Sequence, residues 1–116
     1  MRRNRRILKS QEFQRIIHSK KFFTSPSLCL YKSPRKEDHS RIGISVGKRV
    51  GGAVERNKCK RQLRMMVMEL IPYEDEFDYI IIARAAYFNS SYEENKKQLE
   101  NLYKKFKKIS QSRLRN

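Results

Sequence analysis

The sequence predicts one α+β domain, in which a small sheet packs against helices in the order α-β-β-α-β-α. Three observations predict this class. Two segments have apolar residues at alternate positions, one unbroken apolar run begins at Tyr79, and three longer segments have apolar residues at helical spacing. The 116 residues are enough for one domain and not two, so we expect residues 1–116 to form a single domain.

The chain begins with a basic arm, residues 1–9, which is expected to become ordered on RNA. A helix is predicted from Ser10, the expected N-cap, to about Lys20. Its apolar residues are spaced i, i+3 and i+4, and they are Phe13, Ile16 and Ile17. From this periodicity alone, Phe13 is a core residue.

Two strands are predicted next, at Leu28–Lys32 and at Arg41–Val46. In the first strand, Leu30 and Tyr31 point to opposite faces of the sheet. A polar loop, residues 33–40, joins the two strands. The simplest arrangement of two strands with such a loop is an antiparallel pair.

All four glycines lie between Gly43 and Gly52, on either side of Lys48 and Arg49. Glycine permits positive φ and the close approach of another group. This span is therefore either an anion-binding loop or a tightly packed turn, and the residues alone favour neither. A phosphate-binding P-loop has a similar glycine spacing, but it requires Lys where this chain has Ala53, so nucleotide hydrolysis is excluded.

Residues 53–70 have a helical pattern with two stripes. The apolar stripe contains Cys59, Leu63, Met66 and Leu70. The stripe beside it is basic and contains Arg56, Lys60 and Arg64, widened on its far side by Asn57 and Arg61. A solvated helix face ordinarily mixes charges of both signs, whereas this stripe has no acid. We therefore favour nucleic-acid binding over a solvated face or a nuclear import signal.

The last third of the chain predicts a buried strand and a final helix. An acidic loop, residues 73–78, precedes the apolar run Tyr79–Arg84, which is typical of a strand in the middle of a sheet. Ser91 and Glu94 have the spacing of a capping box and open the last helix. Residues after about Ile109 are expected to form a frayed basic tail.

The charge of the chain indicates its class of partner. The sequence has 28 Lys and Arg against 12 Asp and Glu, a formal net charge of +16 at pH 7. Such an excess attracts polyanions, nucleic acid first, with an anionic membrane surface or an acidic protein as weaker alternatives. No segment has the length of apolar sequence that a membrane-spanning helix or a signal peptide needs, so we expect a cytoplasmic protein.

The residues offer no catalytic centre of their own. Two cysteines and two histidines are too few for a zinc site without other ligands. A Cys–His nucleophile pair is disfavoured, because His39 lies in a polar loop and Cys59 on an apolar stripe. A disulfide between Cys29 and Cys59 is improbable in a cytosolic protein. The acids at 74–78 favour a solvated turn over a Mg²⁺ site. We expect no metal or cofactor on this chain.

The segment Arg41–Arg64, with its strand, glycine turn and helix opening on Ala-Val-Glu-Arg-Asn-Lys-Cys-Lys-Arg, closely resembles the protein subunit of bacterial ribonuclease P. The similarity covers almost the whole chain and includes Glu-Phe-Gln at 12–14. Two departures stand out. Lys58 replaces the third residue of the Arg-Asn-Arg triplet, which keeps the charge but loses the bidentate fork. Gly52 replaces a common Asn and weakens the helix N-cap.

This resemblance implies a fold shared with a small-subunit ribosomal protein and with elongation factor G, in which helix 53–70 makes a left-handed crossover between parallel strands. Composition and periodicity alone would have led us to the right-handed default. The resemblance also implies two RNA partners, the catalytic RNA of ribonuclease P and precursor tRNA. The catalytic RNA and its Mg²⁺ ions would remove the 5′ leader, while the protein binds the leader and stabilises the RNA fold.

The family roles fall on matching positions of this sequence. The residues implied to contact the catalytic RNA are Arg56, Asn57, Lys58, Lys60, Arg61 and Arg64. The residues implied to line a cleft for the single-stranded leader are Phe13, Ile17, Tyr31, Lys48 and Arg49. Aromatic rings stack on splayed bases while nearby cations meet phosphates. The alternative is a ribosomal or RNA-chaperone protein of similar fold, and a DNA-binding protein is more distant, because no helix-turn-helix pair precedes the basic helix.

Overall fold

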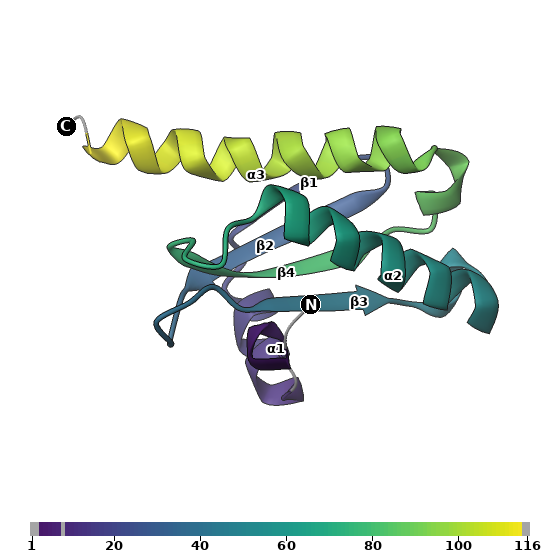
Figure 1. Cartoon of the computed structure of the whole chain (residues 1–116), viewed down its shortest axis with the longest axis horizontal. Helices are drawn as coiled ribbons and strands as arrows, with labels where there is room; N and C mark the ends of the chain where they lie inside the picture. Colours follow the sequence, from purple (N-terminus) through teal and green to yellow (C-terminus); the bar gives the residue numbers. More distant parts are fainter. Residues whose placement is uncertain (1–2, 8, 115–116) are drawn as a thin grey trace.

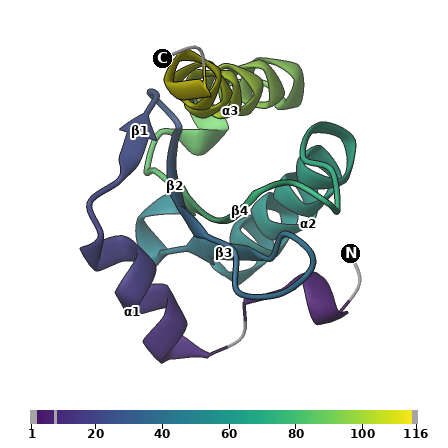
Figure 2. The same ribbon diagram turned by 90° about the vertical axis from the view of Figure 1, so that its left-hand side faces the viewer.

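The computed structural model describes residues 3–7 and 9–114, with side chains described as far as residue 109. Its centre is a four-stranded sheet with the strand order β1-β2-β4-β3. The strands are β1 (Phe22–Thr24), β2 (Leu28–Pro34), β3 (Ile42–Val46) and β4 (Phe77–Ala83). The helices are α1 (Ser10–His18), α2 (Ala53–Leu70) and α3 (Tyr92–Leu114). The helix α1 covers one face of the sheet, and α2 and α3 cover the other (Figures 1 and 2).

The strand β4 lies between β2 and β3, as its unbroken apolar sequence predicted. It pairs antiparallel with β2 and parallel with β3, and Ile81 lies opposite Leu30 on one side and Ile44 on the other. The predicted antiparallel pairing of Leu28–Lys32 with Arg41–Val46 is therefore wrong. A strand that is apolar on both faces needs a hydrogen-bonding neighbour at both edges, and β4 obtains them by inserting between β2 and β3.

The crossover from β3 through α2 to β4 joins adjacent parallel strands. In Figure 1, β3 points to the right and β4 lies above it, while α2 returns in front of the sheet. The side view in Figure 2 separates α2 from α1 on opposite sides of the sheet. This arrangement is left-handed, as the resemblance implied and against the usual preference for right-handed crossovers.

Each face of the sheet has its own apolar cluster. The larger cluster joins the sheet to α2 and α3, and α2 contributes Cys59, Leu63, Met66 and Val67 to it, all fully buried. The predicted member Leu70 is partly buried at its border. On the other face, the buried residues Ile7, Ile16 and Ile80 hold α1 and the N-terminal segment against the sheet.

The structure differs from the expectations at both ends of the chain and in one strand. Within the N-terminal arm, Arg5 and Ile7 are buried against the fold, Arg3, Asn4, Arg6 and Lys9 are exposed, and residues 1, 2 and 8 lie outside the described residues. Lys9, not Ser10, is the N-cap of α1, and it makes no side-chain capping bond. The short strand β1 was not predicted. The helix α3 continues to Leu114, past the predicted fraying point, whereas residues 115 and 116 lie outside the described residues.

The predicted capping box is confirmed. The Ser91 amide donates to Glu94 Oε1 at 2.9 Å, and the Glu94 amide donates to Ser91 Oγ at 3.2 Å. The acidic loop, in contrast, is only partly solvated. Asp75 is buried and accepts hydrogen bonds from Tyr79 and Tyr103, and the buried Asp78 pairs with Arg41. These two acids stabilise the fold, so the expectation of a wholly solvated turn is wrong.

Candidate RNA interface

The α2 basic stripe, defined as Arg56, Lys60 and Arg64, runs along one flank of α2 beside the buried apolar stripe. Its members are half-buried, as is typical of long basic side chains at the border of a core. Successive members stand one helical turn, about 5.4 Å, apart. Asn57 and Arg61 are exposed and extend the stripe toward solvent. The structure thus brings five of the six residues predicted for catalytic-RNA contact onto one surface.

The cations on this surface have no acidic partner among the described side chains. Among the side chains described, no carboxylate lies within ion-pair distance of Arg56, Lys60, Arg61 or Arg64. The acid nearest the carboxyl end of α2, Glu69, pairs instead with Lys96 of α3. A row of unpaired like charges is self-repelling. The surface is therefore suited to a polyanion that supplies the missing negative charge.

Lys58, the sixth predicted residue, lies on the opposite flank of α2. Its Nζ is 5.8 Å from the centroid of the Phe88 ring. Gln62, one turn further along this flank, accepts a hydrogen bond from Tyr87 Oη at 2.7 Å. Lys58 therefore faces the turn before α3 and is separated from the α2 basic stripe.

The aromatic part of the predicted leader cleft is assembled between α1 and the sheet. Phe13, Ile17 and Tyr31 are each partly buried and pack against the same small cluster around Ile80. The Tyr31 ring also lies beside Phe22 of β1, with their centroids 4.9 Å apart. The outer edge of this group borders a groove lined by Ile17, His18, Lys20, Phe22 and Tyr31.

The basic part of the predicted cleft lies at the carboxyl end of β3. Lys48 and Arg49 form a single helical turn, and both are exposed. They line a second groove together with Ile82 and Arg84. Ile82 also borders the apolar cluster under α1. The aromatic and basic groups therefore share one face of the sheet, although they line different grooves.

The glycines of this region serve packing more than anion contact. Gly51 has φ 156°, and a Cβ at this position would stand 2.7 Å from Glu55 Cβ. Gly43 is covered by the Phe13 ring. Only at Gly47 would an added Cβ find open space, since no atom lies within 4 Å of it. Gly47 lines the basic groove, so an incoming group can approach its backbone closely.

Comparison with known proteins decides the family. The sequence model described as Ribonuclease P matches residues 1–107. The chain belongs to the ribonuclease P family. It is similar to the ribonuclease P protein component of Mesoplasma florum, with 41% identity over 109 residues that cover 91% of this chain and 99% of the relative. It is similar also to that of Lactococcus lactis subsp. lactis, with 38% identity over 99 residues and 85% coverage of both chains.

Solved structures agree with this assignment. A Staphylococcus aureus RNase P protein mutant with defective mRNA degradation activity has a TM-score of 0.81 at 35% identity, covering 90% of this chain and 89% of that one. The Thermotoga maritima RNase P protein has a TM-score of 0.72 at 27% identity, covering 84% and 93%. Ribonuclease P membership gives the chain an RNA-binding role in tRNA processing and does not favour the alternative of a ribosomal or RNA-chaperone protein.

Sequence reasoning missed two residues that this ribonuclease P protein presents beside the predicted cleft. Phe22 is 44% exposed next to Tyr31, and it offers the aromatic surface that Ile17 lacks. Arg84 adds a third cation to the groove of Lys48 and Arg49, and its Nη1 donates to the Ser25 carbonyl at 2.8 Å. The strand β1, which carries Phe22, is too short for its sequence pattern to indicate the face on which Phe22 lies. Arg84 ends an apolar run, and that pattern indicates a buried strand and not a place in a basic groove.

Neither cysteine of the chain is placed to act as a nucleophile. Cys29 and Cys59 are buried and unbridged. Burial raises the pKa of the Cys59 thiol to about 12, which keeps it protonated and unreactive at neutral pH. Among the described residues, no group of His, Cys, Asp and Glu is arranged to hold a metal ion. No described helix is long and apolar enough to cross a membrane.

Proposed function

We propose that this chain binds the catalytic RNA of ribonuclease P through the α2 basic stripe and the 5′ leader of precursor tRNA through the α1 face of the sheet. The catalytic RNA, with Mg²⁺ bound to it, then cuts the leader from the tRNA in the cytoplasm. The protein contributes affinity for both RNAs and no reacting group.

The observation that carries this proposal is the unneutralised row of cations on α2. Neutralising phosphates with Lys and Arg releases condensed counterions, and this release gives affinity for structured RNA without sequence preference. Arg61 is exposed, so it is available for direct phosphate contact. Asn57 adds an amide that can donate to phosphate or ribose oxygens.

The leader is a single strand, and the α1 face offers what a single strand needs. The rings of Tyr31 and Phe22 give a sequence-tolerant stacking surface at one end of this face. Lys48, Arg49 and Arg84 give phosphate contacts at the other end. The helix α2 lies on the opposite side of the sheet from α1 (Figure 2), so one protein can hold the catalytic RNA and the leader at the same time.

A reconstituted cleavage assay tests the proposal. Precursor tRNA is incubated at low Mg²⁺ with the protein alone, with the cognate catalytic RNA alone, and with both. We expect no cleavage with protein alone, weak cleavage with RNA alone, and strong cleavage with both. If the protein neither raises cleavage nor tightens the binding of precursor tRNA, the proposal fails.

A further inference from the structure

The N-terminal segment, defined as residues 3–7 with Lys9, contacts the chain directly after α2, beyond the last residue of the α2 basic stripe. Arg5 is buried and its Nη2 donates to the Ile71 carbonyl at 2.8 Å and to the Pro72 carbonyl at 2.9 Å, directly after α2. Ile71 follows Arg64 by seven positions, so it lies on nearly the same side of the helix, about 10 Å further along. The segment is therefore positioned to continue the stripe.

The backbone of this segment is held in place by the fold. The Ile7 amide donates to the Ile42 carbonyl at 2.9 Å, and Arg6 forms a parallel bridge with Ile42, so the segment covers the free edge of β3. The Arg5 side chain, besides its two bonds after α2, donates from Nε to the Ser40 carbonyl at 3.2 Å. These contacts hold the backbone of the segment along the edge of β3.

His39 fixes the segment from the other side. Its Nε2 lies 2.7 Å from the Asn4 carbonyl oxygen, and its Nδ1 lies 2.9 Å from Asp38 Oδ1. Both oxygens can only accept a hydrogen bond, so the site favours an imidazole that carries a proton on both ring nitrogens. The ring is stacked on Tyr73, whose hydroxyl accepts a bond from Asn4 Nδ2 at 2.8 Å.

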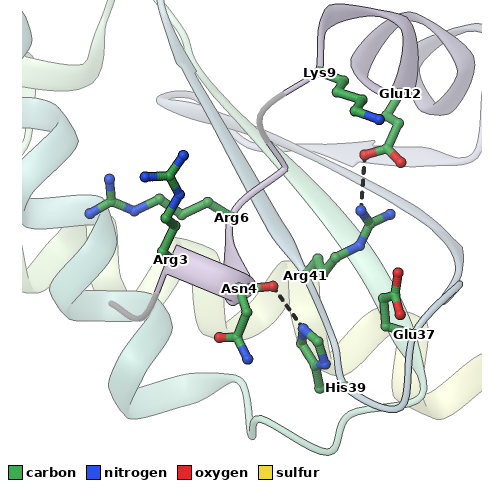
Figure 3. Close-up of a pocket in the computed structure, with 8 residues that line it drawn as sticks. All are labelled: Arg3, Asn4, Arg6, Lys9, Glu12, Glu37, His39 and Arg41. Carbon is green, nitrogen blue, oxygen red and sulfur yellow. Dashed lines mark hydrogen bonds and ion pairs between the residues drawn. The ribbon is translucent and has the colours of Figure 1, made fainter.

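This anchoring leaves the other cations of the segment exposed. The side chains of Arg3, Arg6 and Lys9 line a groove of about 650 Å³ (Figure 3), and among the described side chains no carboxylate lies within ion-pair distance of them. The acid on the groove wall, Glu12, is engaged by Arg41 at 2.9 Å. Glu37 is the second acid of the groove, and it is exposed.

We propose that Arg3, Arg6 and Lys9 form a second phosphate-binding site, which binds the same catalytic RNA that the α2 basic stripe contacts. Arg5 and His39 are its positioning residues, because they hold the backbone from which the three cations project. This inference rests on the proposed function and deepens it by extending the RNA contact surface past the end of α2 and over the edge of β3.

The test compares two variants that each lose two exposed cations. The test variant is Arg3→Gln with Arg6→Gln, and the control is Lys97→Gln with Lys108→Gln on α3, two exposed lysines with no ion pair among the described side chains. Binding to the catalytic RNA is measured over a range of salt concentrations. We expect the test variant to reduce the slope of log K against log salt by roughly 1.4–1.8, for two lost phosphate contacts. The control should leave the slope close to that of wild type.

Two further measurements separate the outcomes. The exchange protection of the Ile7 amide should equal that of wild type in the test variant, because among the described residues the fold is joined to the segment by Arg5, Asn4 and the Ile7 amide, and no ion pair of Arg3 or Arg6 is found. If the test variant keeps the wild-type slope while Arg61→Gln reduces it, this inference is wrong and the proposed function stands. If neither variant changes the slope, the proposed function fails as well. The affinity of the reconstituted complex for precursor tRNA is measured for the same variants. If the test variant lowers only this affinity and leaves catalytic-RNA binding unchanged, the segment contacts the leader and the inference is wrong.

Discussion

The ring of Phe13 lies directly on Gly43, so that a Cβ at Gly43 would stand 2.6 Å from Phe13 Cζ. Phe13 is partly buried against Ile80, and the contact joins α1 to the centre of the sheet. The periodicity of the sequence indicated a core residue, and the resemblance indicated a leader contact. The structure shows that the ring has one side in the core contact and part of its surface exposed, so the two interpretations are compatible.

Gly43→Ala is expected to push the Phe13 ring away from the sheet. The new methyl group would also stand 3.2 Å from Ile80 Cγ1, so it is crowded by the sheet as well as by the ring. Because Phe13 belongs to α1, moving the ring away displaces α1. Overpacking of this kind costs about 1–3 kcal/mol. Urea unfolding measures the loss. The control is Gly47→Ala, where φ is −84° and an added Cβ meets nothing within 4 Å. Equal stability of the two variants would contradict the packing account.

Tyr31→Ala should weaken the binding of precursor tRNA and leave mature tRNA unaffected. The loss of one stacking ring costs about 1–3 kcal/mol per base. Tyr31→Phe keeps the ring beside Phe22 and should bind the leader nearly as well as wild type. Binding of both tRNAs to the reconstituted complex is the measurement. Equal losses for precursor and mature tRNA would remove Tyr31 from the leader contact.

The hold of His39 on the N-terminal segment should weaken as the pH rises. The hydrogen bond to Asp38, followed by that to the Asn4 carbonyl, raises the pKa of His39 above its ordinary value near 6.5. Glu37 also favours the charged ring, whereas burial of the ring lowers the pKa of His39 and opposes it. The stabilisation is therefore complete below about pH 6.5 and is lost as the pH rises through the raised pKa.

Hydrogen exchange of the Ile7 amide measures this effect, after correction for the intrinsic pH dependence of exchange. Protection of Ile7 should fall with rising pH in wild type and should be low and independent of pH in His39→Leu, which cannot donate to Asn4. A wild-type protection factor that does not change between pH 6 and pH 9 would show that the charge on His39 does not hold the segment.

Asp75→Asn should destabilise the fold by about 1–3 kcal/mol at neutral pH, since it leaves buried partners of the carboxylate poorly paired. Asp75 accepts from Tyr79 Oη at 2.7 Å and pairs with Lys107 Nζ at 2.7 Å. Burial alone would raise the pKa of Asp75, but Lys107, Tyr103 and Tyr79 together lower it. Its stabilisation is present above the ordinary carboxyl pKa and is lost as the pH falls through the lowered value.

Urea unfolding at pH 7 and near pH 3 tests this prediction. The difference between wild type and Asp75→Asn should shrink at the lower pH, because the carboxyl of the unfolded wild-type chain takes up a proton below its ordinary pKa. Glu76→Gln is the control, because exposed Glu76 pairs with the same Lys107 at 3.2 Å and should contribute little. A stability difference that is the same at both pH values would argue against the charge of Asp75 as the cause.

The sequence predicted those parts of the fold that depend on local pattern. The run Tyr79–Arg84 was apolar enough to require a central strand, and Ser91 with Glu94 required a helix start. The pairing of the strands could not be predicted locally. The strand β4 lies between β2 and β3, and the loop 33–40 that joins β2 to β3 does not indicate that another strand is inserted there. The strand β1 has three residues, too few for an alternating pattern. The left-handed crossover followed only from the family resemblance.

The interface was predictable to a similar degree. The basic stripe on α2 follows from helical spacing, and the structure leaves it unpaired as expected. The leader residues came from the resemblance, because nothing local connects Tyr31 with Lys48. Phe22 and the N-terminal segment gain their positions from tertiary contacts alone, through Tyr31 and through the carbonyls that Arg5 reaches after α2.

The salt dependence of catalytic-RNA binding tests most directly whether the α2 basic stripe binds the catalytic RNA. Wild type is compared with a variant that carries Arg56→Gln, Lys60→Gln and Arg64→Gln, all on one flank of α2. If each cation neutralises one phosphate, the slope of log K against log salt should fall by about 2–3. Slopes that coincide for the two proteins would contradict the account, because the α2 basic stripe would then make no phosphate contact.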